Sequence, residues 1–280
     1  MYKDNYNDIP SFISMIEKTL VDNWKEDAFT DYNGESLRFS DVARRIAKLH
    51  IGMETLGLQP GDKVAICSRN QANWGVSFLA ALTYGAVPVP LLHEFKAENI
   101  QHLVNHSEAK VFFVDEVIWE GLHESEMPDL EVIVQINDLQ FIYCKNSEHA
   151  DFRQHIAEIF AEKYPNGFGP DDLHFHEDSP EELALINYTS GTSGFSKGVM
   201  LPYRVLWSNV IFADERFRQE PCGKLVSFLP AAHMYGYAFE FLYEFMAGCH
   251  IFYLSRVPSP AIIAQAFREV KPIIIIAVPL

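Results

Sequence analysis

The chain has 280 residues, of which 48% are hydrophobic, and its formal net charge is −16 at pH 7. This much apolar material can form a sizeable core, in one large domain or two smaller ones, and excludes a disordered chain. The acidic balance argues against nucleic-acid binding, which depends on Lys and Arg neutralising phosphates.

The N-terminal residues lack the basic start and the apolar stretch of a secretory signal. The longest apolar region, residues 77–92, contains Gly85, Pro88 and Pro90, which predicts a helix, a turn and a strand rather than a membrane span. The four cysteines are scattered and form no CxxC pair typical of zinc or redox sites. We therefore expect a cytoplasmic protein with no integral membrane segment.

Helices and strands alternate along the first half of the chain. Ser40 is predicted to N-cap a helix that ends at Gly57, because apolar residues recur between them at helical spacing. The next predicted elements are a strand at Lys63–Cys67, a helix at Trp74–Tyr84, a strand at Ala86–Val89, a helix at Glu98–Asn105 and a strand at Val111–Val114. Strands separated by crossover helices predict parallel pairing with helices on both faces.

A predicted strand at residues 183–188 runs directly into small hydroxyl and glycine residues and then a lysine. Glycines let backbone N–H groups approach an anion, hydroxyls donate hydrogen bonds, and the lysine neutralises phosphate oxygens. The residues are Thr189, Ser190, Gly191, Thr192, Ser193, Gly194 and Lys197. Their order predicts a nucleotide phosphate site, with a Ser/Gly-rich surface loop as the alternative, although neither a Walker A loop nor GxGxxG is present.

Residues 189–198, here called the phosphate loop, resemble the phosphate loop of the adenylate-forming enzymes. That family includes acyl-CoA and aryl-CoA ligases, luciferase-like proteins and peptide-synthetase adenylation domains, and its loop reads Thr-Ser-Gly-Thr-Thr-Gly-x-Pro-Lys-Gly. Here Ser193 stands where threonine is usual and Ser196 where proline is usual. Neither change removes a donor or the positive charge.

Two further segments carry the resemblance, in the family's order. Leu229-Pro-Ala-Ala-His233-Met-Tyr-Gly236 is similar to the Leu-Pro-x-x-His block that lines the acyl side of the family's active site. Gly61-Asp-Lys-Val-Ala-Ile, followed by Gly85-Ala-Val-Pro-Val-Pro90, is the third match. The likeness is greatest to long-chain fatty acyl-CoA ligases.

The resemblance implies a reaction in two halves. A carboxylate attacks ATP and releases pyrophosphate, and the acyl-adenylate then transfers its acyl group to CoA, with Mg²⁺ as cofactor. It implies catalytic roles for Lys197 and His233, phosphate binding by residues 189–194 with Lys197, and a magnesium contact for Thr189. Acyl or carboxylate binding would fall to His233, Met234, Tyr235 and Gly236; for His233 the alternative is a core or capping histidine. Arg204 is a weaker candidate cation.

The implied fold is α/β: the N-terminal domain of the acyl-CoA synthetase and luciferase-like fold, with two stacked, mostly parallel sheets and flanking helices. Residues 58–211 would form the first sheet subdomain, and residues 1–57 with 212–280 a partial second one. The chain would end with a helix from Ser259 to Glu269 and a buried strand at Ile273–Val278.

The family's later segments, with its C-terminal lysine domain, do not occur in the sequence. We therefore expect residues 1–280 to be a truncated AMP-binding domain that is inactive alone and self-associates through uncovered apolar surface and a sheet edge. Two alternatives stay open: an aryl- or amino-acid-adenylating member of the same family, and a non-catalytic nucleotide-binding or interaction module.

Overall fold

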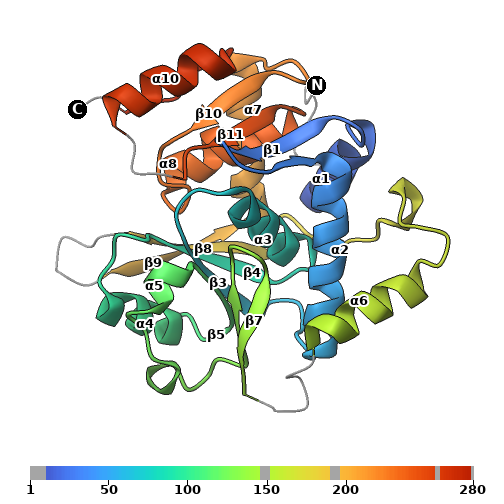
Figure 1. The fold of residues 1–280 in the computed structure, drawn as a ribbon, viewed down its shortest axis with the longest axis vertical. Helices are drawn as coiled ribbons and strands as arrows, with labels where there is room; N and C mark the ends of the chain where they lie inside the picture. Colours follow the sequence, from blue (N-terminus) through green and yellow to red (C-terminus); the bar gives the residue numbers. More distant parts are fainter. Residues whose placement is uncertain (1–10, 146–151, 190–195, 256–258, 279–280) are drawn as a thin grey trace.

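The computed structural model describes residues 11–145, 152–189, 196–255 and 259–278, without the side chains of residues 152–154. The described residues form two main sheets with a helix between them, and a separate two-stranded sheet (Figure 1). The larger sheet has the strand order β4-β3-β5-β6-β7; the smaller one has the order β10-β11-β1-β2. The bounds of the larger sheet are β3 Lys63–Cys67, β4 Val87–Leu91, β5 Ala109–Val114, β6 Val132–Gln135 and β7 Gln140–Cys144. Those of the smaller sheet are β1 Asp27–Asp31, β2 Ser36–Arg38, β10 Lys224–Ser227 and β11 His250–Tyr253.

Both sheets are parallel except at one edge. Strands β4, β3, β5 and β6 are parallel neighbours, and β7 returns antiparallel to β6. In the smaller sheet β2 is antiparallel to β1. The predicted parallel pairing is confirmed, because the connections through α3 (Ala72–Thr83) and α4 (Ala97–His106) are long enough to cross over.

Helix α3 lies between the sheets, and every one of its residues is buried (Figure 1). Its sequence is mostly apolar, as expected of a helix covered on every side, and its polar residues Asn73, Ser77 and Thr83 are buried as well. The Trp74 indole stacks on Phe78, with a ring-centroid distance of 5.3 Å, and Phe241 contacts both rings edge-on. One core cluster therefore continues from one sheet to the other, and the predicted division into two subdomains stays a prediction.

The remaining helices cover the outside of these layers. They are α1 Phe12–Asp22, α2 Phe39–Thr55, α5 Glu116–Trp119, α6 Phe152–Lys163, α7 Tyr203–Phe217 and α10 Pro260–Val270, with short 3-10 turns at Glu124–Glu126 and Pro170–Asp172. The predicted Ser40 cap is wrong. The N-cap is Arg38, two residues earlier, because Asp41 Oδ2 accepts a hydrogen bond from the Arg38 N–H. Gly57, with φ of +71°, follows its C-cap as predicted.

The predicted buried strand at Ile273–Val278 is also wrong. A single bridge joins Ile274 to Leu225 on β10, and Ile273 and Ile275 are 58% and 53% exposed. Within the described residues no second strand pairs with this segment, so a continuous ladder does not form. The preceding helix is confirmed, with Ser259 Oγ accepting a hydrogen bond from the Ile262 N–H. No helix in the described ranges is long and apolar enough to cross a membrane.

Candidate functional site

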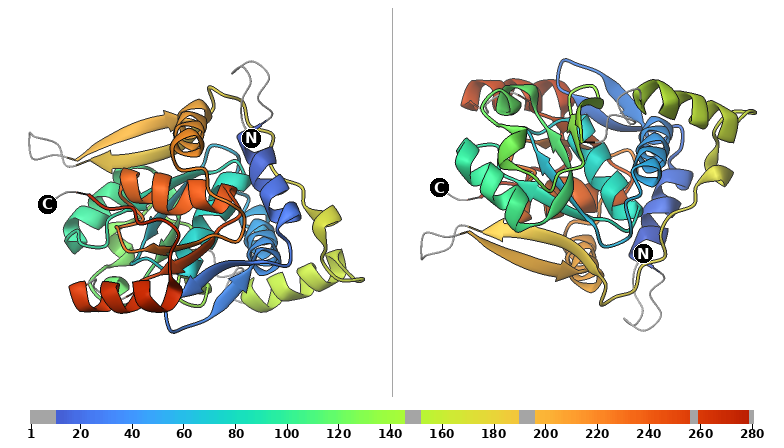
Figure 2. Two further views of the ribbon diagram at one scale, coloured as in Figure 1. Left: turned by 90° about the horizontal axis from the view of Figure 1, so that it is seen from above. Right: turned by 90° about the horizontal axis from the view of Figure 1, so that it is seen from below.

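Strands β8 (Leu183–Thr189) and β9 (Lys197–Pro202) form an antiparallel hairpin that lies along one flank of the larger sheet, beside α7 (Figure 2). Strand β8 packs against β4, whose Pro88 and Pro90 have no N–H to donate. The hairpin therefore forms a separate two-stranded sheet and does not extend the five-stranded ladder.

The hairpin holds both ends of the phosphate loop. Thr189 and Lys197 are register partners in the last pair of the ladder, and both are exposed. The predicted binding residues Ser190, Gly191, Thr192, Ser193 and Gly194 lie outside the described residues. The pairing places one hydroxyl and one ammonium side by side, which suits an anion that approaches this end of the ladder.

The surroundings of the hairpin account for two other polar residues. Tyr188 bonds through its hydroxyl to His106 Nδ1, at 2.7 Å, which ties β8 to the end of α4. Arg204 pairs with Glu181 at 2.9 Å, so this weaker candidate cation already has a carboxylate partner. Among described residues, no group of three or more His, Cys, Asp or Glu side chains could hold a metal ion. Thr189 would supply only one hydroxyl ligand to a magnesium ion. The other ligands would be mostly phosphate and water oxygens.

His233 lies at the end of a loop that we call the histidine loop (residues 228–233). It is exposed and N-caps α8 (Met234–Gly236), and its Nδ1 accepts a hydrogen bond from the Tyr235 N–H at 3.3 Å. The imidazole therefore has a capping role. An Nδ1 that accepts implies a neutral ring with its proton on Nε2, which remains available as a donor.

A buried asparagine joins the two halves of the candidate site. Asn187 on β8 donates through Nδ2 to the Ala232 carbonyl at 3.1 Å and is 3% exposed. Because side chains alternate along a strand, Asn187 and Thr189 lie on the same face of β8. The structure thus places the phosphate-loop strand directly beside the residue that precedes His233.

Sequence reasoning missed Asn70, which follows β3 at the carboxyl end of the larger sheet. Its side chain donates to the Leu229 carbonyl at 2.6 Å and accepts from the Ala231 N–H at 2.9 Å. The available signal was the polar run Ser68-Arg-Asn-Gln71 directly after a buried strand. Strand order here reverses between β3 and β5, the kind of switch point where α/β sheets bind ligands.

The predicted substrate residues do not all face solvent. Met234 and Tyr235 are partly buried, whereas Gly236 is buried against the histidine loop. A Cβ at Gly236 would overlap the Pro230 carbonyl oxygen and lie 3.1 Å from its carbonyl carbon. Gly236 therefore permits a close approach of helix and loop.

Gly236→Ala is expected to lower the free energy of unfolding by about 1–3 kcal/mol, because the obstructing atoms belong to the backbone and cannot rotate away. Chemical denaturation measures the change. Gly121→Ala is the matched control, since its added Cβ would meet the Ile118 carbonyl oxygen at an ordinary 3.7 Å. Equal stability of both variants would contradict the proposed contact.

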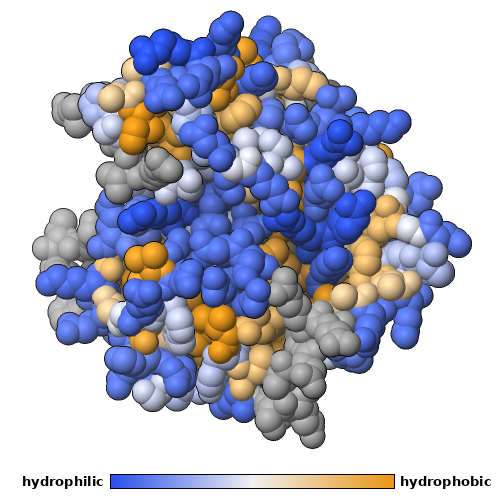
Figure 3. Space-filling view, in the orientation of Figure 1, coloured by the Kyte–Doolittle hydropathy of each residue, from blue (hydrophilic) through white to orange (hydrophobic). Residues whose placement is uncertain are grey.

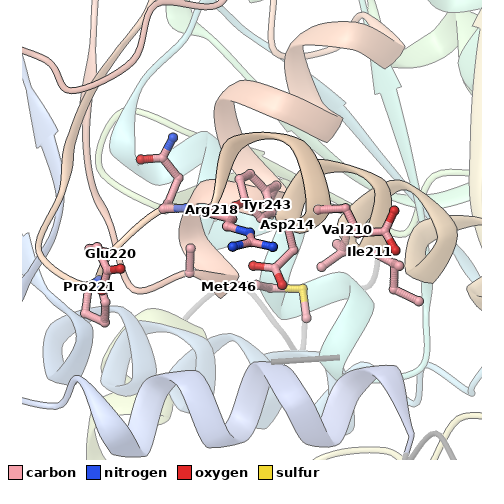
Figure 4. Close-up of a pocket in the computed structure, with 11 residues that line it drawn as sticks. Val210, Ile211, Asp214, Arg218, Glu220, Pro221, Tyr243 and Met246 are labelled. Carbon is pink, nitrogen blue, oxygen red and sulfur yellow. Dashed lines mark hydrogen bonds between the residues drawn. The ribbon is translucent and has the colours of Figure 1, made fainter. Parts of the chain in front are cut away.

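The helix that begins after His233 continues through a π-helical stretch, Tyr237–Leu242, into α9 (Tyr243–Met246). At its far end a pocket of about 410 Å³ opens between α7 and α9 (Figure 4). Figure 4 shows Asp214 and Arg218 pointing toward one another there. None of the predicted site residues lines this pocket.

Comparison with known proteins identifies the fold and then the family. A natural red-emitting luciferase from Phrixothrix hirtus aligns with a TM-score of 0.78 at 19% identity, over 94% of this chain and 50% of that one. The anthranilate CoA ligase AuaEII in complex with anthranoyl-AMP aligns with a TM-score of 0.77 at 16% identity, over 96% and 49%. The predicted fold class, the N-terminal domain of adenylate-forming enzymes, is confirmed.

The sequence itself gives the family. The profile described as AMP-binding enzyme matches residues 17–280, so the chain belongs to that family. Fatty acyl-CoA synthetase A from Dictyostelium discoideum is 27% identical over 267 residues, which are 92% of this chain and 38% of that protein. The chain thus spans well under half the length of this relative.

Proposed function

We propose that the chain is the N-terminal part of an ATP-dependent long-chain fatty acid–CoA ligase. The reaction is adenylation of a carboxylate with release of pyrophosphate, followed by thioester formation with CoA. The supporting observation is the Asn187 to Ala232 hydrogen bond, because it brings the strand of the phosphate loop beside the residue before His233. The likeness to the Dictyostelium synthetase supports the substrate class.

The proposed chemistry requires two anions to meet. Lys197 would offset the charge of the β and γ phosphates and of the departing pyrophosphate, and the N–H groups of residues 190–194 would orient them. A bound Mg²⁺ would supply further charge neutralisation at the phosphates. On the other side, the Nε2–H of His233 would donate to the carboxylate or the adenylate. Met234 and Tyr235 would border the acyl group.

The test is pyrophosphate exchange into ATP by the full gene product, with a panel of carboxylates. Long-chain fatty acids are expected to stimulate exchange most strongly. Stimulation by aryl or amino acids alone would replace the substrate class while keeping the reaction. No stimulation by any carboxylate, in a protein that binds ATP, would refute adenylation and favour a non-catalytic nucleotide-binding module.

Three further properties are part of the proposal. Residues 1–280 alone would not complete the reaction, since the resemblance places a catalytic lysine in a segment that this sequence does not contain. The location would be cytoplasmic. Self-association would use exposed apolar side chains on β9 and after α10, namely Val199, Met200, Ile273, Ile275 and Val278. The face in Figure 3 is largely polar, with its apolar residues in separate groups; sedimentation at several concentrations tests the self-association.

A further inference from the structure

The helix of residues 234–246 carries a carboxylic acid where its sequence is otherwise mostly apolar. Glu240 lies in the π-helical stretch Tyr237–Leu242 and is 1% exposed. A π-helical turn is rare and is frequently found at functional sites. A carboxyl group buried to this degree has to find hydrogen-bond donors, and those of Glu240 come from a distant segment.

A single oxygen of Glu240 receives all of these donors. Its Oε2 accepts hydrogen bonds from the Phe228 N–H at 3.0 Å, the Leu229 N–H at 2.9 Å and the Ser227 hydroxyl at 3.1 Å. The donors lie at the end of β10, where the chain leaves the sheet and enters the histidine loop. Without Glu240, two backbone N–H groups of this partly buried segment would lose their partner.

The same helix also holds the other end of the loop. His233 is its N-cap, and the Tyr237 N–H donates to the His233 carbonyl at 3.0 Å. Between these two ends, the loop backbone bonds to Asn70 and Asn187. The course of residues 228–233 relative to β8 is therefore set by three buried side chains. At the start of the loop, Glu240 accepts from the backbone N–H groups, while Asn70 donates to the Ser227 hydroxyl and the Leu229 carbonyl.

The three hydrogen bonds to Glu240 Oε2 do not require a negatively charged carboxylate. Burial raises the pKa of Glu240 to about 8, more than the hydrogen bonds from residues 227–229 lower it, so the carboxyl carries its proton at neutral pH. A neutral amide of the same shape can accept the same three hydrogen bonds through its carbonyl oxygen. Oε1 has no hydrogen-bond partner among the described residues.

We propose that Glu240 is a positioning residue of the carboxylate side of the site: its Oε2 fixes the start of the histidine loop and so determines where His233 stands relative to strand β8. The inference rests on the proposed function for its catalytic consequence. The hydrogen-bond contact itself can be tested independently of activity.

The experiment compares Glu240→Gln, Glu240→Leu and Glu240→Asp in the full gene product. Glu244→Leu is the matched control: Glu244 is buried on the same helix four residues later, burial raises its pKa to about 7, and neither of its oxygens bonds to residues 227–229. Hydrogen exchange at the Phe228 and Leu229 amides is expected to accelerate by about tenfold or more in Glu240→Leu. It should stay close to wild type in Glu240→Gln and in the control.

The kinetic readout separates positioning from general stability. In pyrophosphate exchange, Glu240→Leu is expected to raise the KM for the carboxylate by about tenfold while the KM for ATP changes by less than about twofold. Glu240→Gln should restore the wild-type KM. If Glu240→Leu does not fold, Glu240→Asp gives the same readouts, because its shorter side chain withdraws the oxygen from the two amides.

Unchanged exchange at both amides in the Leu and Asp variants would overturn the inference, as would equal effects of the Glu240 and Glu244 substitutions. A wild-type protein that shows no carboxylate-dependent exchange would instead refute the proposed function. In that case the amide exchange would still decide whether Glu240 holds the loop.

Discussion

Replacing Lys197 with alanine is expected to lower the rate of carboxylate-dependent pyrophosphate exchange by about 100- to 1000-fold, the usual loss when one charge-stabilising donor is removed. Lys197 is the register partner of Thr189 in the last pair of the β8–β9 ladder and is exposed there. Because both reactants are anions, the loss should fall on the chemical step and on ATP binding together.

Two measurements check this expectation. Calorimetric titration of ATP–Mg²⁺ should show binding to the wild type that disappears in Lys197→Ala, and exchange kinetics should show the fall in rate. Lys18→Ala is the matched control, since Lys18 is an exposed lysine on α1 that pairs with Asp22. Lys197→Arg should retain part of the binding. An alanine variant that binds ATP and exchanges pyrophosphate at the wild-type rate would rule out the predicted role.

Between pH 6 and pH 8, the wild type is expected to lose about 2 kcal/mol more stability than Glu240→Gln. Burial raises the pKa of Glu240 from 4.5 to about 8. Between these two values the folded protein keeps a proton that the unfolded chain has released. Stability from this group is therefore fully present below pH 4.5 and is lost as the pH rises through 8.

Neighbouring titratable groups modify the pH dependence of stability without reversing its sign. Glu244 on the same helix raises the pKa of Glu240 slightly, and Tyr253 on β11 is an acid whose own pKa is raised by burial. His50 and His250, with pKa values lowered by burial to about 4, act in the opposite direction up to about pH 6.5. The titrations of His50, His250 and Tyr253 are common to both proteins and cancel in the comparison, whereas the coupling of Glu244 to Glu240 exists only in the wild type and is part of the measured difference.

Denaturant unfolding of both proteins at several pH values measures the difference. As the pH rises, the free energy of unfolding of the wild type should fall more steeply than that of Glu240→Gln. Parallel curves for wild type and variant would mean that Glu240 is ionised in the folded protein at neutral pH, contrary to its burial.

Local patterns in the sequence determined the order of elements, the parallel pairing and the two matched segments around Thr189 and His233. Strand β3 has the predicted bounds, and the predicted helix at Glu98–Asn105 is observed as α4. These features depend on neighbours within a few residues, because periodicity, caps and glycine turns are local properties. The predicted Ser40 cap was wrong because of another local contact. Asp41 accepts a hydrogen bond from the Arg38 N–H, and Arg38 is the N-cap.

Contacts between distant residues were decided only by the tertiary structure. Asn70, Asn187 and Glu240 bond to one loop from three separate elements, and no single one of them stands in a recognisable motif. The burial of Gly236 and the exposure of Ile273 likewise depend on what packs against them. The sequence by itself therefore predicted candidate site residues, whereas the positions of those that the structure describes depend on hydrogen bonds to backbone groups that only the folded chain brings within reach.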